Sequence, residues 1–213
     1  MIKAIIFDMD GLMVDTEPLF MEATNKLLRK YGKKLSEKEY CSFVGISDEL
    51  FWTKMKFKFE LRERVDYYIK ARVELVNELI ERKLAPMPGF VNLYNNLKRK
   101  GMKIAIASSS HRSNVTKIVN KLRIQSDYTI YSEMVEQQKP NPEIYKKAVE
   151  GLNLETSECI AIEDSRVGVN AAIAAGLKCI CIPNSYTKDQ DHSKATMKLN
   201  SLNDVNDEVL NSL

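Results

Sequence analysis

Two aspartates, Asp8 and Asp10, follow a short apolar run near the start of the chain. The run, residues 4–7, consists of strand-forming residues without alternation, which is typical of a central parallel strand covered on both faces. Side chains two residues apart at a strand end point to the same side, so both carboxylates can face one site. Two carboxylates this close repel each other and, if buried, need a cation or a shared proton. An ordinary turn is the alternative for this stretch taken alone.

Polar residues also follow later strand-like runs of the chain, and a lysine precedes a helix. These residues are Ser108, Ser109, Lys139, Glu163 and Asp164. The carboxyl ends of parallel strands lie at one edge of a sheet, which is where open α/β sheets bind ligands. Taken singly, the serines and acids fit helix starts and the lysine fits a solvated surface. Together at one edge, they predict a site.

Phosphoryl transfer is the chemistry that these residue types support. Carboxylates are hard oxygen ligands that suit Mg²⁺, which makes Asp8, Asp164 and Glu163 candidate metal ligands. We expect Asp8 to attack phosphorus, while the metal and Lys139 offset the repulsion between the carboxylate and the phosphate.

The remaining polar residues are expected to stabilise the phosphoryl group during its transfer and to transfer protons. The hydroxyl of Ser108 and the backbone N–H groups around Ser109 can hold the equatorial phosphoryl oxygens. Asp10 is expected to protonate the departing oxygen and then to take a proton from the water that hydrolyses the aspartyl-phosphate. It needs a raised pKa for this, which partial burial can supply.

The elements that position these residues divide the chain into two parts. Residues 16–83, called the helical block below, contain helical signals and no predicted strand. They include a Ser36/Glu39 capping box and an amphipathic pattern from Leu61 to Lys83. We predict that residues 1–15 and 84–213 form the core and that the helical block is inserted after the first strand.

Strands and helices alternate after residue 88, and this order predicts an α/β fold with a parallel sheet. The expected strands cover residues 4–7, 103–107, 128–131, 159–162 and 178–182. The formal net charge of +3, with both signs interspersed, gives no footprint for nucleic acid, and no apolar run approaches a membrane span. The four cysteines fit buried reduced thiols, which favours a cytoplasmic protein, and a monomer is expected.

Four segments of the chain resemble, in order and spacing, the motifs of the haloacid dehalogenase superfamily. They are FDMDGLMVDTEPL, ASSS, QKPNPEIY and IEDSRVGVNAAIAAG. The resemblance is to the β-phosphoglucomutase-like branch of sugar-phosphate phosphatases and mutases. It implies a Rossmann-like core with an inserted helical cap domain and Mg²⁺ dependence. It also implies Asp8 as nucleophile and Asp10 as acid/base, with the backbone carbonyl of Asp10 as a further metal ligand.

The same resemblance extends to substrate contacts. It implies that Ser108 and Lys139 bind the phosphoryl group, and that the loop 44–47, with Gly45, Ile46 and Ser47, reaches into the site and helps to choose the substrate.

Three further residues are candidates with simpler alternatives. Glu17 could hydrogen-bond a substrate or begin a helix, and His111 and Arg112 could touch the substrate or start a surface helix.

The predicted function is Mg²⁺-dependent hydrolysis of a small phosphorylated metabolite, a sugar phosphate, and three other functions compete with it. Mutases of the β-phosphoglucomutase type have a histidine where this chain has Phe20, and an arginine where it has Asp48. That arginine binds the second phosphate of the bisphosphate intermediate. Asp48 should instead repel this phosphate, which favours hydrolysis. A receiver-type signalling domain also phosphorylates an aspartate, but it lacks the helical insertion and Asp10. Dehalogenases of the superfamily lack the second aspartate.

Overall fold

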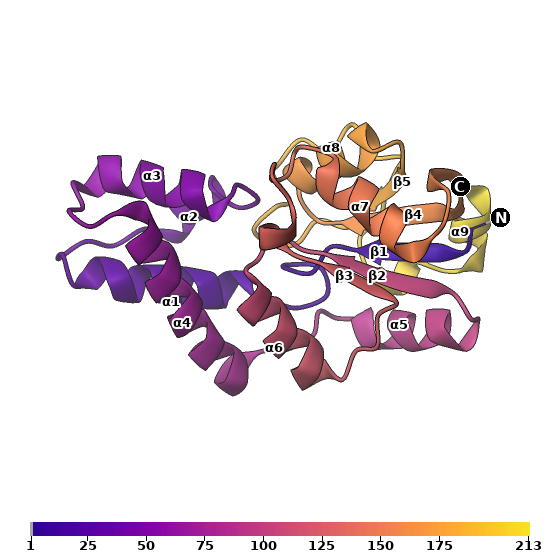
Figure 1. Ribbon diagram of the computed structural model, residues 1–213, viewed down its shortest axis with the longest axis horizontal. Coiled ribbons are helices and arrows are strands. Elements are labelled where there is room, and N and C mark those ends of the chain that lie inside the picture. Colours follow the sequence, from indigo (N-terminus) through magenta and orange to yellow (C-terminus); the bar gives the residue numbers. More distant parts are fainter. Residues whose placement is uncertain (1) are drawn as a thin grey trace.

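Strand β1 (Ala4–Phe7) lies in the middle of a six-stranded parallel sheet in the computed structural model, which describes residues 2–213. The strand order is β3-β2-β1-β4-β5-β6, and Figure 1 labels the first five of these strands. The other strands are β2 (Lys103–Ala107), β3 (Tyr128–Ile130), β4 (Cys159–Glu163), β5 (Lys178–Cys181) and β6 (Met197–Lys198). Every pairing is parallel, and β1 pairs with β2 and β4 from Ala4 onward. The predicted fold class is therefore confirmed, and the strand carboxyl ends share one edge.

The two faces of the sheet bury different side chains. Helices α7 (Glu143–Leu152) and α8 (Arg166–Ala174) cover a face on which most side chains are small. These are Ala4, Ala105, Ala107, Cys159, Ala161, Cys179 and Cys181. The three cysteines are free and buried here, as expected, whereas Cys41 is half-buried. Small side chains let two helices approach the sheet closely.

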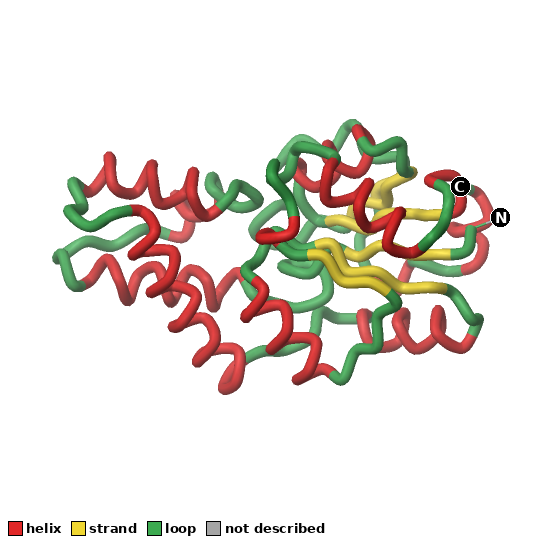
Figure 2. Tube along the Cα trace, viewed as in Figure 1, coloured by secondary structure: helices red, strands yellow, loops and turns green. Residues whose placement is uncertain are grey.

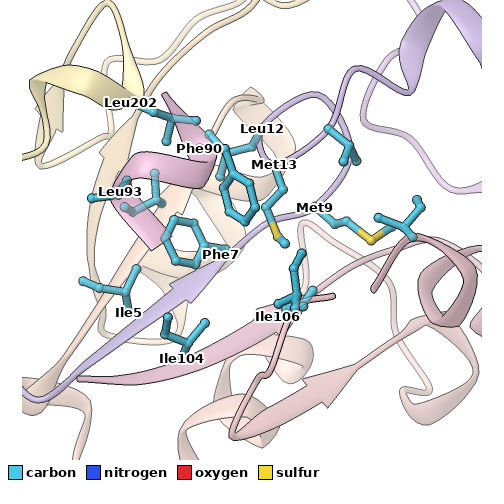
Figure 3. Close-up of a cluster of buried hydrophobic side chains, with 14 of the residues drawn as sticks. Ile5, Phe7, Met9, Leu12, Met13, Phe90, Leu93, Ile104, Ile106 and Leu202 are labelled. Atoms are coloured by element: carbon cyan, nitrogen blue, oxygen red, sulfur yellow. The ribbon is translucent and has the colours of Figure 1, made fainter. Parts of the chain in front are cut away.

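The opposite face carries bulky aliphatic and aromatic residues. It packs against α5 (Phe90–Arg99), α6 (Arg112–Leu122) and α9 (Asp207–Ser212). Phe7 meets Phe90 edge to face, with ring centroids 5.7 Å apart. Figure 3 shows this contact with Leu93, Ile104 and Ile106 around it. Alternation along β1 thus sends successive side chains into two different cores.

The helical block contains α1 (Glu17–Arg29), α2 (Glu37–Cys41), α3 (Asp48–Phe59) and α4 (Val65–Lys83). The structure describes no strand in this segment, and Figure 2 shows its helices set to one side of the sheet. The block has a hydrophobic core of its own, centred on Trp52 stacked against Tyr68. The Ser36/Glu39 capping box is present at the start of α2.

The two connections of the helical block run side by side. Val14 and Pro86 form an antiparallel bridge, and the Asp15 N–H donates to the Ala85 carbonyl at 3.0 Å. The Met87 N–H donates to the Met13 carbonyl at 2.9 Å. The chain therefore leaves the first strand and returns to the core at nearly the same point.

Some element boundaries differ from the predicted ones. The long helix begins at Val65 rather than at Leu61, because residues 61–64 connect it to α3 and Arg64, with an extended backbone, is its N-cap. Strand β6 was not predicted, because it has only two residues and too short a run for a recognisable pattern. No helix that the structure describes is long and apolar enough to cross a membrane.

Candidate active site

Asp8 and Asp10 lie in the turn that follows β1, at the carboxyl edge of the sheet. The turn is closed by the Met13 N–H, which donates to the Met9 carbonyl at 2.9 Å. Gly11 has φ of +77°, and a Cβ at this position would lie 2.8 Å from the Asp164 carboxylate. Glycine is thus required both for the backbone conformation and for the close approach to Asp164.

Lys139 is buried between two carboxylates. Its Nζ donates to Asp8 Oδ1 at 2.6 Å and to Glu163 Oε1 at 2.7 Å, and also to the Ala107 carbonyl at 3.0 Å. The Tyr145 hydroxyl donates to the same Glu163 oxygen at 2.6 Å. Burial lowers the pKa of Lys139, but the Asp8 and Glu163 carboxylates outweigh burial and raise it. The charged form of Lys139 is therefore favoured beside Asp8.

Three buried carboxylates converge at this edge of the sheet. Asp8, Glu163 and Asp164 each offer an oxygen within 4.8 Å of the other two. Burial raises the pKa of Asp8 well above its usual range, and the Glu163 charge adds to the rise. Burial, with the charges of Asp8 and Glu163, does the same for Asp164. Ionised together, three acids beside one buried ammonium would carry excess negative charge, which a divalent cation would offset.

Asp164 and Glu163 differ in how their oxygens are engaged. Asp164 Oδ2 accepts from the Asn184 amide at 2.7 Å, and no hydrogen bond within the described part of the chain involves its other oxygen. Both oxygens of Glu163 accept hydrogen bonds, one from Lys139 and Tyr145 and the other from the Asp164 N–H at 3.2 Å.

Asp10 accepts hydrogen bonds from three hydroxyl groups. Thr16 donates to Oδ1 at 2.8 Å, and Ser108 and Ser110 donate to Oδ2 at 3.0 and 2.8 Å. Burial raises the pKa of Asp10, and the three hydroxyls oppose the rise. The side chain is thus held in place and favoured in the protonated form relative to an exposed aspartate.

These residues form the floor of a cavity whose roof is the helical block. Asp8, Asp10, Ser109, Ser110, Lys139 and Asp164 line the floor. Glu17, Phe20, Tyr40, Phe43, Gly45, Ile46, Asp48, Phe51 and Arg72 line the roof. Ser108 and Glu163 are fully buried behind the floor. The structure therefore brings the four polar residues after the later strands, and Lys139, to one place with Asp8 and Asp10.

Two ionic or hydrogen-bonded pairs lie in the roof. Asp48 forms an ion pair with Arg72, whose side chain is only 6% exposed. The Tyr40 hydroxyl donates to Glu17 Oε2 at 2.8 Å. Burial raises the pKa of Glu17 from 4.5 to about 7, although the Tyr40 hydrogen bond opposes the rise.

Three residues predicted to contact substrate lie outside this cavity. Ser47 is the N-cap of α3, where its hydroxyl accepts from the Leu50 N–H at 3.3 Å. His111 and Arg112 line a separate surface groove between α4 and α6. There His111 Nε2 lies 2.9 Å from a Glu133 oxygen.

Several residues of the site were not predicted from the sequence. They are Thr16, Arg72, Ser110, Tyr145 and Asn184. Arg72 did carry a signal, because it lies between Tyr68 and Val76 on the buried stripe of α4, where a charge needs a partner. Asn184 follows the last long strand at the same sheet edge, which is a weaker signal of the same kind.

The sequence matches a described family along most of its length. A sequence model for haloacid dehalogenase-like hydrolases matches residues 5–182. A protein named phosphorylated carbohydrates phosphatase, from Thermotoga maritima, is 29% identical over 180 residues, which cover 84% of this chain and 83% of the relative.

Solved structures resemble the whole chain. A mutant of CbbY from Rhodobacter sphaeroides, solved in complex with xylulose-1,5-bisphosphate, has a TM-score of 0.86 at 27% identity, covering 96% of each chain. A β-phosphoglucomutase from Clostridium difficile has a TM-score of 0.85 at 26% identity, covering 100% of this chain and 96% of its own.

Proposed function

The chain belongs to the haloacid dehalogenase-like hydrolase family, and we propose that it hydrolyses a small sugar phosphate, with Mg²⁺, through an aspartyl-phosphate on Asp8. The family and its named phosphatases identify the chain as a phosphatase-type hydrolase. The observation that carries the mechanism is the placement of Asp8, whose carboxylate lies 2.6 Å from the Lys139 ammonium at the floor of the cavity.

Asp8 is the nucleophile in this proposal. Its carboxylate oxygen attacks phosphorus, and Lys139 offsets the repulsion between the two anions. Ser109 and Ser110 line the floor beside it, where their hydroxyl and N–H groups can hold phosphoryl oxygens. Ser108, which now donates to Asp10, can turn to the same oxygens.

Asp10 is the acid and then the base. Its burial-raised pKa favours a proton on the carboxyl group, which is what protonation of the departing oxygen requires. The deprotonated form then accepts a proton from the water that attacks the aspartyl-phosphate. Thr16 and Ser110 hold the side chain in one orientation during both steps.

The buried acids suit Mg²⁺, and Asp8 and Asp164 are proposed as its side-chain ligands, with the backbone carbonyl of Asp10. Asp164 has an oxygen outside the hydrogen bond from Asn184. Because both Glu163 oxygens already accept hydrogen bonds, Glu163 is assigned to positioning Lys139 rather than to direct ligation. When bound, the ion supplies positive charge that offsets the charge of the phosphate and its attacking oxygen.

We assign residues 16–83 to a cap domain over a core of residues 1–15 and 84–213. Its own hydrophobic cluster and its paired connections at Val14 and Pro86 support this division. Gly45 and Ile46 extend the roof toward the floor, and Gly45 approaches Val167 of α8 closely. The roof thereby limits water around Asp8 and contacts the part of the substrate that is not transferred.

A phosphosugar mutase is the alternative function. A mutase must bind a second phosphate at the roof while its bisphosphate intermediate reorients in the cavity. Asp48 and Glu17 place negative charge there, and Arg72 is already paired with Asp48. Hydrolysis is therefore favoured.

The test is phosphate release from a panel of sugar and nucleotide monophosphates with Mg²⁺. We expect turnover by the unaltered chain, and Asp8→Asn to lower kcat by at least about 10³-fold, because the amide is a poor nucleophile. Circular dichroism should show an unchanged fold. Full activity of Asp8→Asn, or of the unaltered chain in excess chelator, contradicts the proposal.

A further inference from the structure

Arg72 is a buried cation in the roof, opposite the catalytic floor. It comes from the middle of α4, and its ion pair with Asp48 joins that helix to the first residue of α3. The guanidinium carbon lies 5.3 Å from the ring centroid of Phe20 and 5.0 Å from that of Phe51. Aromatic rings on these sides fix the guanidinium and exclude water from it.

Asp48 is paired with the guanidinium of Arg72, so an anionic ligand would compete with Asp48 for that group. Both side chains line the cavity, but Asp48 is 36% exposed and Arg72 only 6%. Glu17 lies in the same roof and adds a second carboxylate. Two acids and one arginine make the roof neutral or negative, depending on the proton of Glu17.

We propose that the Asp48–Arg72 ion pair restricts the cavity to monophosphates, because it blocks the arginine that would otherwise bind a second phosphate. This inference rests on the proposed phosphatase function and names its substrate class: one phosphate on an uncharged, hydroxyl-bearing remainder. A second phosphate dianion would have to displace Asp48 from Arg72 or lie beside both carboxylates, and either arrangement costs free energy. Hydroxyl groups can instead donate to Asp48 and Glu17.

Equilibrium binding measurements test the preference for monophosphates without turnover of the ligand. The probes are glucose 6-phosphate and glucose 1,6-bisphosphate, measured by calorimetry with Mg²⁺ in the Asp8→Asn protein. Adding Asp48→Asn is expected to tighten bisphosphate binding about tenfold, while monophosphate binding changes less than about threefold. Asp48→Ser, which leaves a smaller polar group, is the second variant and should give the same shift.

Two controls separate the effect of the Asp48–Arg72 ion pair from the effect of removing a negative charge elsewhere in the helical block. Arg72→Met added to Asp48→Asn should remove the gain, because the arginine is the group that is uncovered. Asp66→Asn removes a comparable pair with Arg64 on the exposed surface of the helical block, and it should change neither affinity.

The outcomes are distinct for the inference and for the proposed function. The inference is overturned if folded Asp48→Asn and Asp48→Ser proteins show no gain for the bisphosphate, or if the gain persists without Arg72. It is also overturned if the parent protein prefers the bisphosphate. A tenfold gain together with no phosphate release from any monophosphate by the unaltered chain supports the binding inference and counts against hydrolysis.

Discussion

At the scale of single residues, burial governs how the acids of the cavity behave. Asp8, Asp10, Glu17 and Asp164 all have raised pKa values, and burial is the largest cause in each case. A buried acid with a raised pKa binds its proton more tightly in the folded chain than in the unfolded chain. The folded state then loses stability as the pH rises toward the folded pKa.

Glu17 gives a pH-dependent prediction. Its pKa is about 7 in the fold and 4.5 without it, so the free energy of unfolding should fall between pH 4.5 and 7. The loss from this residue is at most roughly 3 kcal/mol, and Glu17→Gln should remove it. Urea unfolding at pH 5 and pH 8, with chelator present, should therefore show the variant gaining stability relative to the parent at the higher pH.

A matched variant for this measurement is Glu22→Gln, which alters an exposed glutamate on the same helix. It should shift stability by a similar small amount at both pH values. The prediction fails if the difference between Glu17→Gln and the parent is the same at pH 5 and pH 8.

The sequence predicted the residues of the floor better than those of the roof. Asp8 and Asp164 follow predicted strands and Lys139 precedes a predicted helix, so their meeting point follows from the parallel sheet. The Asp48–Arg72 pair joins residues 24 positions apart on two helices. Such a contact depends on how the two helices pack against each other, and no local sequence pattern predicts this packing.

At the scale of elements, the start of α8 positions the Glu163–Lys139 contact. Ser165 is the N-cap, and its hydroxyl accepts from the Gly168 N–H at 3.2 Å. A Cβ on Gly168 would lie 1.9–2.1 Å from the Glu163 carboxylate atoms, closer than any real contact. The first turn of α8 therefore leaves space that the Glu163 side chain fills.

Gly168→Ala is predicted to push the Glu163 carboxylate away from Lys139 and to misplace the lysine beside Asp8. A misplacement of about 1 Å can cost about 10²-fold in rate, and we expect a loss of kcat/KM of that order. Phosphate release and thermal unfolding should be measured together.

Gly151→Ala is the control, because its added Cβ would also crowd a side chain, Tyr128, at 2.5 Å, but in α7. It should lower stability and leave kcat/KM nearly unchanged. Equal activity losses in the two variants would argue against a positioning role for Gly168.

Element types were easier to predict than element boundaries. The alternation of strands and helices predicted where β1 to β5 lie along the chain, because periodic segments carry strong patterns. The start of α4 was placed four residues early, since Leu61 continues the apolar pattern although it lies in the connection between α3 and α4. The two-residue β6 depends on pairing with β5 rather than on its own sequence.

At the scale of the whole molecule, the buried acids make the fold sensitive to cations. Asp8, Glu163 and Asp164 repel one another in the folded chain, and unfolding would separate them. A cation that binds only the folded protein adds stability by mass action.

Mg²⁺ is therefore predicted to raise the thermal midpoint. At 100 times its Kd the gain is about 2.7 kcal/mol, which amounts to several degrees for a chain of this size. Differential scanning calorimetry with Mg²⁺ or with chelator measures the shift. Asp164→Asn should lose most of the shift. An undiminished shift of the thermal midpoint in that variant would show that the ion binds away from these acids.

The bridge between Val14 and Pro86 brings the entry and the exit of the helical block together. A segment joined at adjacent points can be exchanged for one of another length without rearranging the strands on which the reaction depends. Descendants of one ancestral enzyme could in this way acquire different roofs, and so different nutrients to act upon, over a floor that stays the same.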